Sequence, residues 1–324
     1  MKILIGSCGG LTGVYLSRNI KRLLGISNIT LLGFDSNSEV VTRFFLDDFF
    51  IIRPATQEDL FIRDLVKLLN DAKPDVYVPV HSNEVRVISK YDQILRSQTP
   101  TQFLISPYGT YEVLDDKLKA YEELNAMGIS TPKYFTSASN ITKFPVLAKP
   151  RRSSGSKGIT FCNDRRLAEA LEESWNDLVF VELIQGREIT VDAFFNAQGR
   201  LVTYSQRERL KVLGGAAIVT RNDFSNDVKD YLVKIASKLK IIGPANFQFF
   251  IDSEGRIFFT DVNLRFASGG LPLSVESGAN LVKLYVLEAL GQPYNPSEFQ
   301  SDRKKRIMYR YFEEFYEIEE NNDF

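Results

Sequence analysis

The sequence predicts a mixed α/β and α+β protein built from two or three domains. Its first hundred residues alternate strand-like and helix-like segments, which is typical of a parallel sheet covered by helices. Further along, short strands joined by turns favour antiparallel sheets. With 324 residues the chain exceeds the usual length of one domain. We therefore expect domains at 1–114, 115–181 and 182–324.

The first predicted unit is a strand, a glycine-rich turn and a helix. Residues 2–6 (KILIG) form a short apolar strand, residues 7–13 (SCGGLTG) the turn, and the helix stops at Gly25 before a second strand that ends at Asp35. An NAD-linked dehydrogenase would place Asp35 on a ribose hydroxyl, but the turn lacks full G-x-G-x-x-G spacing. The alternative is a tight turn in a Rossmann-like domain whose helix N-terminus faces a substrate anion.

Polar residues follow a later strand of the same domain. The strand at 76–80 (VYVPV) runs into His81 and Glu84, and residues 102–106 (QFLIS) are predicted as a further strand. The carboxyl ends of parallel strands border a ligand crevice in such sheets. Glu84 is therefore a candidate contact to a second substrate, with a surface or capping role as the alternative.

Composition excludes several classes of protein. A net charge of −1 leaves no electrostatic footprint for nucleic acid or an anionic membrane. No apolar stretch approaches the length of a membrane span or resembles a signal peptide. His81 is the one histidine, which excludes mechanisms that need two imidazoles. Cys8 and Cys162 are too few for a disulfide framework, so we expect two buried thiols and a cytoplasmic protein.

A phosphate-binding loop is predicted between two strands near residue 150. The strand before it carries a lysine, and the loop RRSSGSKG combines glycines, hydroxyls and cations. Glycines allow a close backbone approach, and the other groups donate hydrogen bonds to phosphate. The Walker A pattern is absent, and a solvated hairpin turn is the alternative. The residues predicted at this site are Lys149, Ser154, Gly155, Ser156, Lys157 and Gly158.

A polar stripe on a hairpin is the strongest candidate for an active site. Side chains two apart on a strand face the same side. Asp261, Asn263 and Arg265 therefore share one face, and the apolar Val262, Leu264 and Phe266 share the other. Gln248, on the preceding strand, can meet Asp261 across the hairpin. One carboxylate with amide oxygens suits Mg²⁺ shared with phosphates, and arginine suits phosphoryl charge. The alternative is a solvated outer face of an edge hairpin.

The sequence offers further candidates for binding the nucleotide and the substrate. Glu182 and Glu188 flank a turn that suits adenine and ribose, although exposed charges at a strand end explain them as well. Arg207 and Arg209 share a strand face with Lys211 and can hold an anionic substrate, or can guard a strand edge. Small residues after the stripe permit close approach by a substrate. These small residues include Ser268 and Gly269.

In this order of parts the chain resembles the ATP-grasp superfamily, in particular proteins similar to the large subunit of carbamoyl-phosphate synthase and carboxylate–amine ligases. The resemblance covers essentially the whole chain. It implies an N-terminal Rossmann-like domain, a small lid sub-domain and a C-terminal α+β sub-domain, with ATP between two antiparallel sheets. It places Lys117, Lys149 and residues 155–158 on the phosphates, Glu182, Leu183 and Ile184 on adenine, Glu188 on ribose, Gln248, Asp261 and Asn263 on metal, and Arg265 on the transferred phosphoryl group.

The pattern departs from the family in two respects. Glutamate is commoner at the metal positions, whereas here Asp261 is the one carboxylate of the stripe, which does not favour occupancy by two metals. A carbamoyl-phosphate synthase has two ATP-grasp halves and this chain has one, and a biotin-carboxylase assignment lacks its bicarbonate motif and biotin domain.

The resemblance implies an ATP- and Mg²⁺-dependent ligase. It would phosphorylate a carboxylate or bicarbonate to an acyl phosphate and transfer the acyl group to an amine or similar nucleophile. The expected partners are small-molecule carboxylate and amine substrates, with a homodimer as a compatible assembly and no nucleic acid or membrane. Alternatives are a non-catalytic ATP-binding regulator of the same fold, thiol ligation, and the NAD-binding oxidoreductase.

Overall fold

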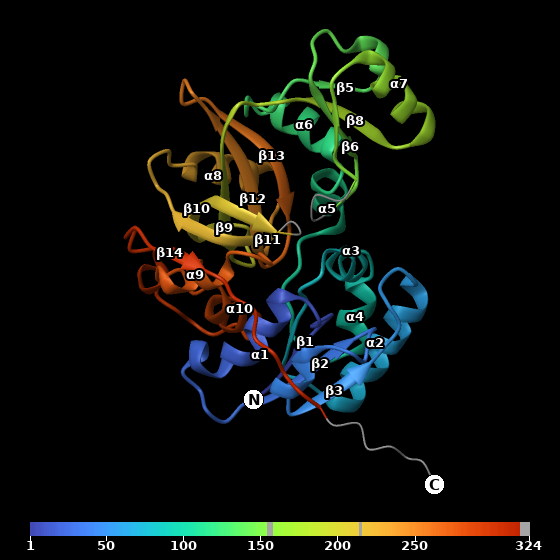
Figure 1. Ribbon diagram of the computed structural model, residues 1–324. Coiled ribbons are helices and arrows are strands. Elements are labelled where there is room, and N and C mark those ends of the chain that lie inside the picture. The colour runs from blue at the N-terminus through green and yellow to red at the C-terminus, as the bar shows by residue number, and fades with distance from the viewer. Residues whose placement is uncertain (154–157, 214–215, 318–324) are drawn as a thin grey trace.

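The computed structural model describes residues 1–153, 158–213 and 216–317 of the chain. Three sheets organise it: a parallel sheet near the N-terminus, a small antiparallel sheet in the middle of the chain, and a large antiparallel sheet near the C-terminus (Figure 1). This confirms the predicted mixture of α/β and α+β architecture. No helix in the described part of the chain is both long and apolar enough to cross a membrane.

The N-terminal sheet has four parallel strands in the order β3-β2-β1-β4. Its first strand and helix are joined by the glycine turn, and Gly25 ends that helix in the left-handed conformation, at φ 71°. The strands are β1 (Lys2–Ile5), β2 (Thr30–Asp35), β3 (Asp48–Ile51) and β4 (Val76–Val78). The helices are α1 (Leu11–Leu24), α2 (Glu58–Ala72), α3 (Ser82–Lys90), α4 (Asp92–Gln98), α5 (Tyr108–Leu114) and the 3₁₀ helix η1 (Val41–Phe45).

One predicted strand of this part is wrong. Residues 102–106 form only a single bridge, between Gln102 and Val76. The backbone N–H of Leu104 instead donates to the hydroxyl of Tyr285, at 3.0 Å. Contact with a side chain from the C-terminal part of the chain therefore replaces strand pairing.

The middle sheet has four antiparallel strands in the order β5-β8-β6-β7. Its last strand ends at Glu182, one residue beyond the expected boundary at 181, and the domain division itself stays a prediction. The strands are β5 (Tyr134–Phe135), β6 (Val146–Pro150), β7 (Thr160–Cys162) and β8 (Leu178–Glu182). The helices are α6 (Lys117–Ala126), α7 (Arg165–Ser174) and the 3₁₀ helix η2 (Ala138–Asn140).

The C-terminal sheet has six strands in the order β13-β12-β9-β10-β11-β14, each antiparallel to its neighbour. The predicted hairpin is β12 and β13. The strands are β9 (Gly186–Phe195), β10 (Leu201–Leu213), β11 (Ala216–Asn222), β12 (Gly243–Asp252), β13 (Ile257–Asn263) and β14 (Ile307–Tyr309). The helices are α8 (Lys229–Lys238), α9 (Leu271–Glu276), α10 (Leu281–Ala289) and the 3₁₀ helix η3 (Pro296–Phe299).

The N-terminal and C-terminal parts share one apolar core. Side chains of β1 and α1 pack in the same cluster as Phe266 and side chains of α10. The hydroxyl of Tyr285 on α10 donates to the backbone oxygen of Tyr77 in β4, at 2.9 Å. These contacts hold the N-terminal sheet against the C-terminal one.

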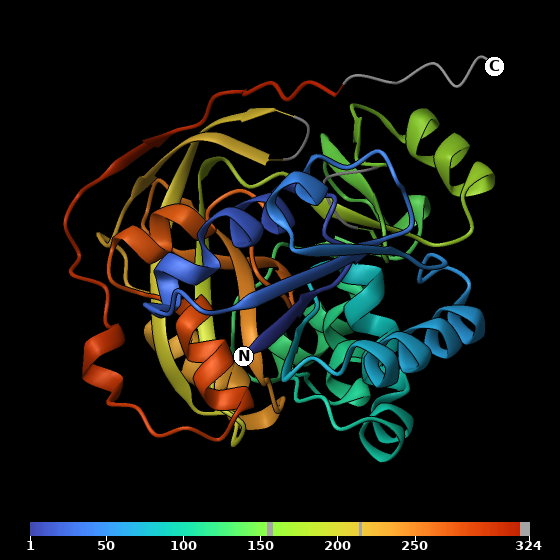
Figure 2. The same ribbon diagram turned by 90° about the horizontal axis from the view of Figure 1, so that it is seen from below.

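The C-terminal segment leaves its sheet and returns to the N-terminal part (Figure 2). The apolar and aromatic residues from Ile307 onward also favour a strand, and within the described residues β14 pairs with β11 over 307–309. Beyond it Phe315 stacks on Phe44, with ring centroids 5.8 Å apart. Aromatic contact with η1 thus takes the place of a longer strand.

Both thiols are buried and free, as expected. Burial raises the pKa of Cys8 to about 12, so this thiol is neutral and inert as a nucleophile.

Candidate functional site

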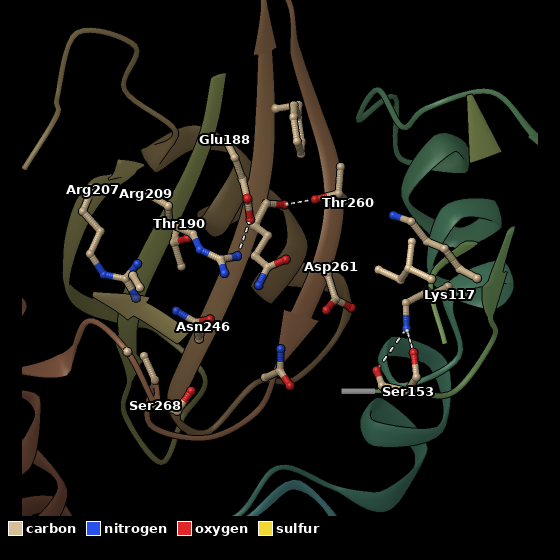
Figure 3. Close-up of a pocket in the computed structure, with 18 of the residues that line it drawn as sticks. Lys117, Ser153, Glu188, Thr190, Arg207, Arg209, Asn246, Thr260, Asp261 and Ser268 are labelled. Atoms are coloured by element: carbon tan, nitrogen blue, oxygen red, sulfur yellow. Dashed lines mark hydrogen bonds and ion pairs between the residues drawn. The ribbon is translucent and has the colours of Figure 1, made fainter. Parts of the chain in front are cut away.

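A pocket of about 240 Å³ lies between the middle sheet and the C-terminal sheet (Figure 3). The middle part of the chain contributes lysines to one wall, and β9, β10, β12 and β13 form the other. Eleven of the residues singled out in the sequence line this one cavity. They are Lys117, Lys149, Glu188, Arg207, Arg209, Gln248, Asp261, Asn263, Arg265, Ser268 and Gly269.

The polar stripe forms as its two-residue period predicts. Gln248 pairs with Asp261 across the β12–β13 hairpin. Val262 and Leu264 are buried, with 6% and 8% exposure, whereas the polar residues between them line the pocket. The alternative of a solvated outer hairpin face is therefore wrong.

Arg265 lies just beyond the end of β13 and is fixed by three hydrogen bonds. Its Nε donates to Ser82 Oγ at 2.7 Å, and its guanidinium also donates to the backbone oxygen of Phe266 at 2.8 Å and to Asn263 Oδ1 at 3.2 Å. Burial lowers the pKa of Arg265, and the nearby Tyr111 and Asp261 oppose that shift. None of its hydrogen-bond acceptors is a carboxylate.

Lys149 stands on the opposite wall, in β6. Burial lowers the pKa of its ammonium, and Asp261 across the pocket opposes this. Among the described residues its amine has no hydrogen-bond or ion-pair partner. A cation held out of water in this way is positioned to receive an anion.

Lys117 lies beside it, in the first turn of α6. The preceding Asp116 is fully buried, caps the helix by accepting from the backbone N–H of Leu118 at 3.1 Å, and pairs with Arg151 at 2.6 Å. The Lys117 ammonium donates to the backbone oxygen and Oγ of Ser153, at 3.1 and 3.3 Å. Figure 3 shows Lys117 and Asp261 on opposite walls, with the Lys117 ammonium directed to Ser153.

Arg207 belongs to a buried network that the sequence did not reveal. It and Asp192 are 3% and 2% exposed, and its guanidinium lies 3.2 Å from Asp192 Oδ1. Asp192 also accepts from Asn246 Nδ2 at 2.6 Å and from Ser274 Oγ at 2.5 Å. The hypothesis of a solvated basic strand edge is wrong for Arg207. Asp192 lies two and four residues beyond Thr190 and Glu188, so period-two reasoning on β9 could have found it.

Arg209 pairs with Glu188 instead of standing free. Its guanidinium donates to Glu188 Oε1 at 2.8 Å (Figure 3). The expected partner Lys211 is exposed, because the β10–β11 register shifts between Arg209 and Lys211. The irregularity takes Lys211 off the face that lines the pocket.

The loop after the stripe is held between two arginines. A Cβ added at Gly270 would lie 1.7 Å from Arg207 Nε, so only glycine fits over this guanidinium. Arg310, just after β14, donates to the backbone oxygen of Gly269 at 3.1 Å and lies 3.5 Å from that of Ser268. Nothing local in the sequence points to Arg310, because the C-terminal segment reaches the loop only through the fold.

Two other sets of predicted residues lie elsewhere. Glu84 is fully buried, accepts from Tyr77 and from the backbone N–H of Val80 and His81, and caps α3. The substrate contact expected of Glu84 is therefore replaced by the capping role, and burial raises its pKa to about 7. Glu182, Leu183 and Ile184 line a separate pocket bordered by the tip of the β12–β13 hairpin, not the one that holds the stripe.

The glycine loop is described only in part. Ser154, Gly155, Ser156 and Lys157 lie outside the described residues. Gly158 has φ +76°, a conformation that favours glycine, and a Cβ there would lie 2.8 Å from the Pro150 ring.

The N-terminal glycine turn does not form a dinucleotide site of the expected kind. Asp35 accepts the backbone N–H of Gly9 at 2.8 Å and that of Asn37 at 3.1 Å. Its carboxylate thus closes the turn, where the NAD hypothesis needs it for a ribose. This favours the alternative of a tight turn in a Rossmann-like unit.

Comparison with known proteins agrees with this arrangement. A family described as ATP-grasp in the biosynthetic pathway with Ter operon matches residues 174–315. The carbamoyl phosphate synthase large chain of Clostridium beijerinckii is 28% identical over 306 residues, which cover 86% of this chain and 27% of that one. The chain is thus similar to an ATP-grasp family over 174–315 and to carbamoyl phosphate synthase large chains over most of its length. It spans about a quarter of the length of these curated relatives.

Solved structures share the ATP-grasp fold over nearly the whole chain. The biotin carboxylase domain dimer of Hydrogenobacter thermophilus 2-oxoglutarate carboxylase, in complex with MgADP, ADP and bicarbonate, has a TM-score of 0.74 at 16% identity and covers 94% of this chain and 73% of its own. L-amino acid ligase from Bacillus licheniformis has a TM-score of 0.70 at 19% identity, over 92% and 76% of the two chains. The ATP-grasp fold predicted from the sequence is thus confirmed.

Proposed function

We propose that this ATP-grasp protein is an ATP- and Mg²⁺-dependent ligase that joins a carboxylate, or bicarbonate, to an amine or similar nucleophile through an acyl phosphate. The observation that carries the proposal is the pair of walls around the main pocket. Lys149, which has no anionic partner among the described residues, faces a stripe of Asp261, Asn263 and Arg265 across a cavity. This arrangement suits a polyphosphate with a metal on one side and cations on the other.

Charge balance in the pocket supports an anionic ligand. Five cationic residues line it against two acidic ones. Arg209 is paired with Glu188 and Arg207 with Asp192. Among the lining residues this leaves Asp261 as the one acid for Lys117, Lys149 and Arg265. Charges buried in excess of their partners are costly unless a ligand completes them. The triphosphate of ATP would do so.

The residues present fit one magnesium ion. The stripe offers the Asp261 carboxylate with the side-chain amides of Gln248 and Asn263, all lining the same pocket. Mg²⁺ takes oxygen ligands and is commonly held by one or two carboxylates together with substrate phosphates. Among the residues the structure describes, no group of three or more His, Cys, Asp or Glu could hold a metal without such help. The bound ion would neutralise phosphate charge during transfer.

The first step is phosphoryl transfer to the carboxylate. A carboxylate oxygen attacks the γ-phosphorus, the bond to the bridging oxygen breaks, and ADP leaves. Lys149 and Arg265 stabilise charge on the transferred group from opposite walls. Arg265 is held by Ser82, Phe266 and Asn263, so it needs little reorganisation to act.

The second step transfers the acyl group. The nucleophile attacks the acyl carbon, the carbon–oxygen bond to phosphate breaks, inorganic phosphate leaves, and the amine loses a proton. Water competes at this stage, so the acyl phosphate must be shielded. Gly158 lies beside the pocket residue Ile159, at the end of the loop predicted to close over the phosphates.

Three further features are part of the proposal: the adenine site, a homodimeric assembly and a reducing compartment. The segment Glu182–Ile184 joins the two sheets, and we propose that its backbone borders the adenine. A homodimer also stays a proposal, prompted by the dimeric carboxylase domain among the structural neighbours. The two free thiols suit a reducing compartment such as the cytoplasm.

A release assay tests the proposed function. ADP and phosphate release from MgATP would be measured with bicarbonate, small carboxylates and amino acids, each with and without candidate amines. At least one pair should release both products together. Asp261→Asn should lower that rate roughly 100-fold or more, because it removes charge at the metal position. Glu254→Gln, at the exposed tip of the same hairpin, is the matched control and should retain full activity. No release with any pair, or an unaffected Asp261→Asn variant, would contradict the proposal.

A further inference from the structure

A second pocket, of about 230 Å³, adjoins the main one and has no role in the mechanism so far. It lies between α3, α5 and the residues that follow β6. Ser153, which holds Lys117, lines both cavities. The residues with charge around the second pocket are Arg86, Glu112, Asp115 and Arg152.

Arg265, which we propose contacts the transferred phosphoryl group, lies between the two pockets. Ser82 lines the second pocket, and its Oγ accepts from Arg265 Nε at 2.7 Å. Tyr111, also in the lining, donates to the backbone oxygen of Ser82 at 2.9 Å. A molecule in the second pocket would therefore sit next to the place where the acyl phosphate forms.

Within the part of the chain that the structure describes, Asp115 is the partly buried acid of this pocket that has no partner. Its carboxylate makes no hydrogen bond or ion pair with a described residue. Burial raises its pKa, and Lys117 and Arg152 oppose that shift. The neighbouring Asp116 is the contrast, because it caps α6 and pairs with Arg151.

The guanidinium of Arg152 has only one long ion-pair contact among the described residues. It lies 3.5 Å from Asp116 Oδ2, an atom that Arg151 already contacts at 2.6 Å, and half of its side chain is exposed. Arg86 lines the same cavity and pairs with Glu58, which it shares with Lys90. The pocket thus offers a free carboxylate and a weakly held guanidinium within one small space.

We infer that the second pocket binds the nucleophile and that this nucleophile is an amino acid, with its amine at Asp115 and its carboxylate at Arg152 and Arg86. The inference rests on the proposed ligase function and names its acceptor. The volume suits a small molecule, since pockets for drug-sized ligands are about 300–1,000 Å³. Asp115 takes the proton that the ammonium must lose before the nitrogen attacks the acyl carbon and phosphate leaves.

Calorimetric binding in the presence of saturating magnesium and a non-hydrolysable ATP analogue tests the inference. The probes are the common amino acids, with methylamine and acetate as the matched amine-only and acid-only compounds. We expect at least one amino acid to bind, and the two simple probes to bind more than tenfold more weakly. Asp115→Asn and Arg152→Gln should each weaken the amino acid at least tenfold, since a hydrogen bond to a charged group contributes roughly 1.5–3 kcal/mol.

The controls are Asp92→Asn on α4 and Arg166→Gln on α7, which lie outside both pockets and should bind like the wild type. If Asp115→Asn fails to fold, the half-exposed Arg152→Gln carries the test. If the ATP analogue binds but no amino acid does, the inference is overturned and the proposed function stands. The same holds if the folded variants bind the amino acid with unchanged affinity. Failure of the ATP analogue itself to bind would overturn both.

Discussion

The two walls of the main pocket hold their charges differently. On β9 and β10 each arginine that lines the pocket has a carboxylate partner, Asp192 for Arg207 and Glu188 for Arg209. On the opposite wall Lys149 has no hydrogen-bond or ion-pair partner among the residues the structure describes, and Asp261 acts on its charge from across the cavity. The paired charges belong to the folded protein, whereas Lys149 needs a ligand to complete it. We therefore expect the paired arginines of β9 and β10 to contribute mainly to stability, and Lys149 to contribute mainly to ligand binding.

The largest effect is expected at Asp192. Asp192→Asn leaves the buried Arg207 without its counter-charge and disturbs two further hydrogen bonds, from Asn246 and Ser274. Breaking a buried pair in this way costs roughly 3–5 kcal/mol. Urea unfolding of wild type and variant measures the loss. Asp92→Asn, which breaks an exposed helical pair with Arg96, should cost less than about 1 kcal/mol. A similarly small loss for Asp192→Asn would show that the Arg207–Asp192 pair does not stabilise the wall formed by β9 and β10.

A smaller loss of stability is expected from Gly270→Ala. The new Cβ would collide with Arg207, which is pinned to Asp192 and cannot move aside cheaply. Overpacking of this kind costs roughly 1–3 kcal/mol. The control is Gly109→Ala, where the added Cβ meets nothing within 4 Å and an exposed helix position should gain up to about 1 kcal/mol. Equal melting temperatures of the two variants would remove the argument for a tightly seated loop.

Arg310→Gln should affect substrate use more than stability. It releases the backbone oxygens of Ser268 and Gly269, so the loop loses its fixed position against the pocket. We expect KM for the carboxylate substrate to rise about tenfold, the equivalent of one hydrogen bond from a charged group, with little change in KM for ATP. Steady-state kinetics on the pair of substrates found by the release assay measures this. Arg306→Gln, which removes a surface pair with Asp302, is the control and should leave both constants unchanged.

Local patterns predicted the parts of the site that lie on regular strands. The alternation of Asp261, Asn263 and Arg265 with apolar residues depends only on strand geometry, and the pairing of Gln248 with Asp261 follows from the hairpin. Lys149 was found because a strand precedes a glycine loop. The same reasoning predicted a parallel sheet followed by antiparallel ones, but it was wrong for residues 102–106 and for most of the segment after Ile307.

Contacts between distant segments were not predictable in this way. Asp192 matters because three side chains from other elements converge on it, and Arg310 matters because the C-terminal segment folds back. Glu84 was misassigned because sequence does not show that Tyr77 and two backbone N–H groups enclose its carboxylate. Partners of this kind are set by tertiary packing, which has no local signature.

The affinity for MgATP of wild type, Lys149→Met and Lys119→Met tests the central claim most directly. Lys119 is an exposed lysine on α6, away from the pocket, so its loss controls for net charge. By calorimetry Lys149→Met should bind MgATP roughly 10- to 100-fold more weakly, since it loses a hydrogen bond worth roughly 1.5–3 kcal/mol. It should also unfold no earlier than the wild type, because a buried cation without a partner is removed. Equal affinity in all three proteins, or a Lys149→Met variant that is destabilised without losing MgATP, would contradict the account.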